Sequence, residues 1–98
     1  MKKLINGILH MFRKTKIDEN TSLVPMSRDS FRYKEGDRAI DISVELMSGE
    51  TSRIIYSSSI QQWLPPHDKD LISDEKKREI LQKVCENFDA NGYSYTVQ

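Results

Sequence analysis

The stretch that decides the fold is Ile40-Asp41-Ile42-Ser43-Val44-Glu45-Leu46. Apolar and polar side chains alternate along it at every second position, which is the period at which a β-strand presents its two faces. The four apolar side chains are therefore expected to face a core and the three polar ones to face water. This is the clearest strand pattern in the chain and predicts a sheet with one buried face.

Shorter patterns on both sides extend this sheet. Phe31 and Tyr33 alternate with basic residues, and Gly36 lies in a tight turn where a positive φ costs little. A second turn is expected at residues 48–50. A third strand follows at residues 53–56, and its adjacent isoleucines predict either burial on both faces or a bulge. The alternation over residues 93–97 predicts a last strand.

One helix is expected between the third strand and the last. Ser73 is a good N-cap, and the two acidic residues that follow it complement the helix dipole. The apolar stripe of this helix consists of Ile80, Leu81, Val84 and Phe88. Asn91-Gly92 is a typical C-terminal stop. The predicted fold class is therefore α+β: an antiparallel β meander with a C-terminal helix packed on one face, preceded by a short N-terminal amphipathic helix.

The N-terminal residues differ from the rest in charge. Apolar side chains at helical spacing between residues 4 and 12 predict the amphipathic helix. Residues 1–16 hold five of the 15 basic residues and no acid, which leaves ten basic against 15 acidic residues in the remainder. Residues 14–22 are polar and aperiodic, so we interpret 1–22 as a basic segment with its linker and 23–98 as a single α+β domain. The segment either docks on that domain, lies loosely ordered, or makes weak contact with a membrane surface through residues 1–16.

Composition narrows the classes of protein. A chain of 98 residues has room for one modest core. Cys85 is the only cysteine, so no intramolecular disulfide is possible, and a reducing cytoplasm is expected. The acidic remainder argues against nucleic acid as the ligand. No apolar run is long enough for a membrane span, and the N-terminus lacks the cleavage site of a signal peptide.

Catalysis is not expected. Ser57, Ser58 and Ser59 precede His67 and Asp68, but there is no nucleophile elbow, and adjacent histidine and aspartate do not easily orient each other as a triad requires. Cys85 fits a buried, inert thiol. The two histidines and one cysteine lack the spacing of metal ligands, and the chain has no glycine-rich phosphate loop. We expect no catalytic residue, no cofactor and no metal site.

The candidate residues are those that could bind a protein partner. Asp41 and Glu45 come first, because alternation places both on the wet face of the best-defined strand. The second group lies in the loop before the helix and comprises Trp63, His67, Asp68 and Asp70. Each has a structural alternative: charge pairing with the neighbouring strand for the acids of the first group, and packing beneath its own loop for Trp63.

A family resemblance sharpens this interpretation. The residues that carry it are Ser30–Arg38, Val44-Glu45-Leu46, Ile55-Tyr56, Ser59-Ile60, Trp63-x-Pro65-Pro66-His67 and the capped helix that closes on Gly92. Over roughly residues 23–98 the chain resembles the immunity protein 74 family of bacterial polymorphic toxin systems. The resemblance implies a cytoplasmic antidote that binds and neutralises a cognate toxin, and many such toxins are nucleases with basic clefts. The alternatives are a membrane-associated adaptor module and a small enzyme whose site needs a second subunit.

Overall fold

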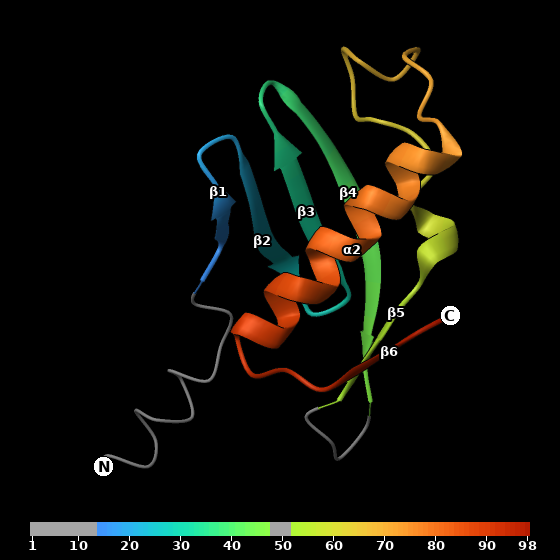
Figure 1. Cartoon of the computed structure of the whole chain (residues 1–98). Coiled ribbons are helices and arrows are strands. Elements are labelled where there is room, and N and C mark those ends of the chain that lie inside the picture. Colours follow the sequence, from blue (N-terminus) through green and yellow to red (C-terminus); the bar gives the residue numbers. More distant parts are fainter. Residues whose placement is uncertain (1–13, 48–51) are drawn as a thin grey trace.

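The computed structural model describes residues 14–47 and 52–98. The amphipathic helix expected near the N-terminus and the turn expected at residues 48–50 lie outside these ranges. Within them, a sheet of six strands is covered on one face by a long helix (Figure 1). The elements are β1 (Lys16–Asp18), β2 (Thr21–Ser27), β3 (Ser30–Glu35), β4 (Arg38–Leu46), β5 (Arg53–Ile55), the 3-10 turn η1 (Ser57–Ser59), α2 (Asp74–Ala90) and β6 (Tyr95–Val97).

The strands follow one another across the sheet in the order of the sequence. Strands β1 to β5 pair antiparallel with their neighbours, as the meander prediction requires. The last strand differs, because β6 pairs parallel with β5. Two neighbouring parallel strands need a long crossover, and α2 supplies it by lying obliquely across the sheet (Figure 1). The fold is therefore mostly antiparallel, with one parallel pair closed by the helix.

The core lies between α2 and one face of the sheet. The predicted register of β4 is confirmed, since Ile40, Ile42 and Val44 are buried. Paired residues share a face, so Phe31 beside Ile42 also points inward, and its ring lies 5.1 Å from that of Phe88 on the helix. The helical stripe is buried at three of its four expected positions. Leu81, expected in the core, is half-buried at its margin.

The prediction of a linker over residues 14–22 is wrong for the residues of this range that lie in strands. Residues 16–18 form β1, and the boundary placed after residue 22 falls inside β2. The segment is also bonded to the fold. The Leu23 amide donates to the Thr15 carbonyl over 2.7 Å, and the Lys14 amide donates to Asn91 Oδ1 over 2.8 Å. Strand β1 is short and mostly exposed at the sheet edge, so it carries no alternating apolar pattern.

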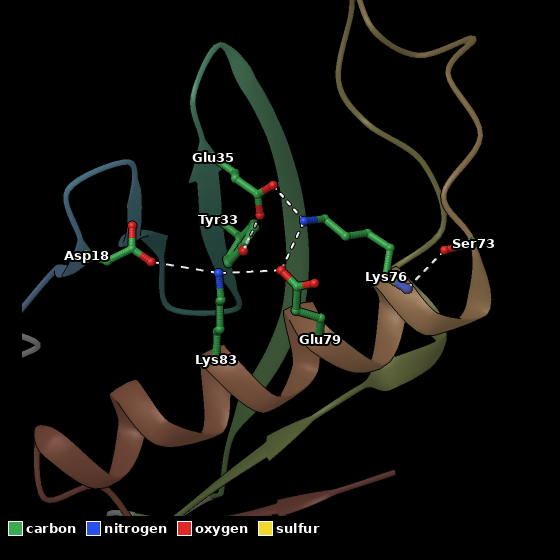
Figure 2. A network of polar contacts seen from close by, with 7 residues as sticks. All are labelled: Asp18, Tyr33, Glu35, Ser73, Lys76, Glu79 and Lys83. Carbon is green, nitrogen blue, oxygen red and sulfur yellow. Dashed lines mark hydrogen bonds and ion pairs between the residues drawn. The ribbon is translucent and has the colours of Figure 1, made fainter.

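A polar network fastens α2 to the sheet beside the core (Figure 2). The buried Tyr33 hydroxyl donates to Glu35 over 2.6 Å. Lys76 of the helix donates to Glu35 over 2.6 Å and to Glu79 over 3.0 Å. The ammonium of Lys83 continues the network, at 3.4 Å from Glu79 and 3.7 Å from Asp18 on β1. The network therefore joins strands β1 and β3 to two successive turns of α2.

The pKa shifts in this network follow from burial and pairing. Burial raises the pKa of Glu35, but the hydrogen bonds from Lys76 and Tyr33 outweigh it, so the net shift is downward. Burial lowers the pKa of Lys76, and the hydrogen bonds to Glu35 and Glu79 reverse that shift, so its pKa is raised. Burial, followed by the hydrogen bond to Glu35, raises the pKa of Tyr33. The folded state thus favours the charged pair and the neutral phenol.

Candidate functional site

The side chains of Ser57, Ser59 and His67, which were considered for catalysis, make contacts within the fold. Ser57 Oγ donates to the carbonyl of Gln98 over 2.8 Å. Ser59 Oγ donates to the carbonyl of Tyr56 over 2.6 Å and accepts the amide of Ser43 over 2.9 Å. The bond with Ser43 holds η1 against β4, and the bond with Gln98 joins η1 to the residue after β6. The His67 ring lies between Asp70 of its own loop and Asp37 of the turn between β3 and β4.

The remaining chemistry of the described residues gives no metal-binding group. Across residues 14–47 and 52–98, no cluster of three or more histidine, cysteine, aspartate or glutamate side chains is arranged to hold a metal ion. Cys85 is half-buried beside the core, and burial raises the pKa of its thiol. A thiol with a raised pKa is a weak nucleophile at neutral pH, as expected for a structural cysteine.

The first candidate surface is the sheet face opposite α2. Pairing of β3 with β4 places Asp41 beside Arg32 on this face. The guanidinium binds the carboxylate with two hydrogen bonds, of 2.7 and 3.0 Å. The hydrogen bond to Asp41, followed by its charge, raises the pKa of Arg32. Cross-strand pairing is therefore the structural role of Asp41, and its negative charge is already neutralised within the chain.

Glu45 lies further along the same face and has a different setting. Its carboxylate accepts a hydrogen bond from the Tyr56 hydroxyl, and that bond is the largest cause of the raised pKa of Tyr56. Glu45 and Tyr56 line a shallow depression with Asp29, Ser43 and Val44. This lining holds two carboxylates and no basic side chain. Sequence reasoning missed Asp29, which lies in the turn before β3 and has no periodic pattern to connect it with Glu45.

The second candidate surface is the loop from residue 60 to residue 73. Its two ends are anchored in the core, because Ile60 and Trp63 on one side and Ile72 on the other are buried. Trp63 is 3% exposed, so its structural alternative, packing beneath the loop, describes its position. The guanidinium of Arg38 lies 6.0 Å from the centre of its ring. The loop is also bonded to β4 where the Leu64 amide donates to the carbonyl of Ala39 over 2.7 Å.

Charged side chains tie the outer part of this loop to the turn between β3 and β4. Arg38 donates to Asp70 over 2.7 Å. The His67 ring lies between two carboxylates, with Nε2 3.5 Å from Asp37 and Nδ1 3.5 Å from Asp70. Asp68 is half-buried and forms no ion pair with another described residue. The structure thus brings His67 and Asp70 together and adds Asp37 and Arg38, which the sequence did not single out.

The six predicted residues divide between two separate places. Strand β4 connects them, with Arg38 at the loop end and Glu45 near the other end. Seven residues of strand at roughly 3.4 Å each put these two about 24 Å apart. The open face and the loop are therefore two candidate surfaces, and Trp63 is buried beneath the second.

Comparison with known proteins identifies a family. The family model described as Immunity protein 74 matches residues 23–98, most of the chain. No curated protein and no solved structure gives a significant match. Among the residues that the structure describes, no helix is both long and apolar enough to cross a membrane.

Proposed function

The chain belongs to the immunity protein 74 family, and from this premise we propose that it is a non-catalytic protein that binds and neutralises a cognate bacterial toxin. The observation that carries the proposal is the match over residues 23–98, which contains most of β2, the strands after it, the loop and α2. Neutralisation by binding needs a stable surface and no reactive group. The hydrogen-bonded hydroxyls of Ser57 and Ser59 and the half-buried Cys85 are compatible with such a protein.

The charge of the chain suggests the kind of toxin. Beyond residue 16 the sequence holds ten basic and 15 acidic residues, an excess of five negative charges. A toxin with a basic surface, such as a nuclease with a basic substrate cleft, would be attracted to this chain. Charge complementarity of this kind accelerates association and discriminates against other partners. We place the encounter in the cytoplasm of the cell that makes both proteins.

Two surfaces are proposed for the contact. The open sheet face offers Glu45 and its neighbour Asp29, with Asp41 held by Arg32. The loop offers His67, Asp68 and Asp70. We leave Trp63 out of the proposed contact, because its side chain is buried.

Co-expression with the toxin encoded beside this chain tests the function and separates the surfaces. The parent protein is expected to restore growth of a host that produces the toxin. Glu45→Lys tests the open face, and Asp68→Lys tests the loop. Asp41→Lys alone is unsuitable, because it would place a second cation against Arg32. The double exchange Arg32→Asp with Asp41→Arg keeps an ion pair and is the matched control.

The outcomes are distinct. Reduced growth with one reversal, at unchanged protein level, assigns the contact to that surface. Full protection by both reversals would remove these acids from the contact. If the parent neither protects nor binds a toxic neighbour, the immunity function is wrong, and the membrane-associated adaptor becomes the better hypothesis.

A further inference from the structure

The loop before α2 holds one large apolar side chain almost wholly in water. Leu71 is 97% exposed, whereas the next residue, Ile72, is 9% exposed and belongs to the core. Other large hydrophobic side chains at the surface of the described residues are half-exposed at most, with Met26 at 49% and Val97 at 42%. Single apolar side chains at a surface are common. What distinguishes Leu71 is how completely it is exposed and how firmly its loop is held.

The loop that carries Leu71 is fastened on both sides. Near its two ends, the side chains of Trp63 and Ile72 are buried in the core. Asp70, the residue just before Leu71, is held by an ion pair with Arg38 at 2.7 Å. Two turns of the backbone add to this, with the His67 amide donating to Leu64 and the Asp70 amide donating to His67, each over 3.0 Å. A side chain presented by a restrained segment loses less conformational entropy on binding than one on a loose loop.

The surroundings of Leu71 are acidic. Asp70, just before it, is paired with Arg38, but Asp68, Asp74 and Glu75 form no ion pair with another described residue. Lys69 is the only basic residue between positions 67 and 75. An apolar side chain with an acidic rim fits an apolar pocket with a basic rim, because the centre of an interface is desolvated while its rim remains polar and charged.

From these observations we propose that Leu71 is the apolar anchor of the toxin contact, entering an apolar pocket rimmed by lysine and arginine side chains on the toxin. This inference rests on the proposed function and assigns the contact to the loop in preference to the open sheet face. The acidic residues around Leu71 favour a basic toxin over the other possible partners. Two copies of this chain meeting at Leu71 would bring like charges together, and an anionic membrane would repel the same acids.

Calorimetric titration of the full chain with an inactivated form of the toxin encoded beside it is the test. Leu71→Ala is expected to weaken the complex about 30-fold, the loss typical of truncating a buried interface anchor. Leu71→Met, which nearly conserves volume, should keep most of the affinity. Met26→Ala is the matched control, since it truncates an exposed apolar side chain of β2 away from the loop. The Tm of each free variant is expected to equal that of the parent.

The outcomes separate this inference from the function on which it rests. Binding by the parent that Leu71→Ala leaves unchanged would overturn the anchor alone. Absence of binding by the parent would overturn both the proposed function and the anchor. Sedimentation of the free protein provides a further arm: a dimer that Leu71→Ala dissociates would assign the loop to a second copy and overturn the toxin as its occupant.

Discussion

At the scale of single residues, Tyr33 connects the core with the polar network. Its ring is fully buried, yet its hydroxyl reaches Glu35, which in turn binds Lys76 of the helix. A buried hydroxyl without a partner costs free energy, so the bond to Glu35 offsets that loss and also orients the carboxylate toward the lysine. Glu35 thus satisfies the buried hydroxyl of Tyr33 and also binds the helix through Lys76.

This network predicts how stability depends on pH. The pKa of Glu35 is lowered from 4.5, so its contribution is present above that value and is lost as acid protonates the folded state. The pKa of Lys76 is raised from 10.5 and that of Tyr33 from 10.0, so their contributions are present below these values and are lost in alkali. We expect a plateau of the free energy of unfolding between the two windows, measured by urea denaturation.

The substitution Glu35→Gln tests the loss of stability at low pH. The variant should be less stable than the parent at pH 7. Below about pH 4.5 its free energy of unfolding should fall less steeply with decreasing pH than that of the parent. The two slopes should differ by up to about 1.4 kcal/mol per pH unit, the value for one proton. Glu19→Gln, at an exposed position of the turn after β1, is the control and should keep the parent's slope. Equal acid slopes in parent and Glu35→Gln would contradict the role assigned to this pair.

The residues of the candidate site were predictable in part. Alternation correctly placed Asp41 and Glu45 on the face away from the helix, and the structural alternative for Asp41, a pair with the neighbouring strand, was visible in the opposite charges of β3 and β4. Burial of Trp63 could be anticipated from the small number of aromatic residues. The exposure of Leu71 could not, because an apolar residue in an aperiodic loop has no pattern that distinguishes it from the buried Ile72 beside it.

At the scale of elements, two strands were missed: β1, and the seven-residue β2, whose pattern is weakened by Pro25 and by the polar residues at both of its ends. Strand β4, with nine residues, and α2, with 17, carry strong periodic patterns and were predicted with their buried faces. Strand β1 has three residues and one half-buried side chain, too few for a period to appear. The direction of β6 was also out of reach, since alternation is the same in parallel and antiparallel strands. Its direction depends on where α2 returns the chain.

The hydrogen bonds of Lys14 and Thr15, which precede β1, predict that residues 14–16 contribute to stability. A chain lacking residues 1–16 loses the bonds of Lys14 with Asn91 and of Thr15 with Leu23, whereas a chain lacking residues 1–13 retains them. Three hydrogen bonds at about 1 kcal/mol or slightly less each suggest a loss of about 2 kcal/mol, or a fall in Tm of roughly 10 °C between the two truncations. Thermal unfolding followed by circular dichroism would measure it. Equal Tm values would show that residues 14–16 are dispensable for stability, as a linker would be.

At the scale of the whole molecule, the fold has two layers and presents two kinds of surface. The helix and the inner sheet face enclose the core, while the outer face carries neutralised pairs such as Arg32 with Asp41. The loop projects beyond the sheet near the turn between β3 and β4 (Figure 1). A protein built in this way has a stable interior and a restrained loop that carries acidic side chains and one exposed leucine. These properties suit a protein that acts by binding to the surface of another protein.

The most direct measurement is complex formation between the purified full chain and an inactivated form of the toxin proposed as its partner, measured by calorimetry at low and high salt. The account predicts a defined complex with a Kd of about 10⁻⁷ M or tighter, as in other specific complexes. Because the attraction involves opposite charges, the Kd should rise as salt increases. A neighbouring protein that is toxic in cells, yet forms no complex with this chain at either salt concentration, would contradict the proposed function.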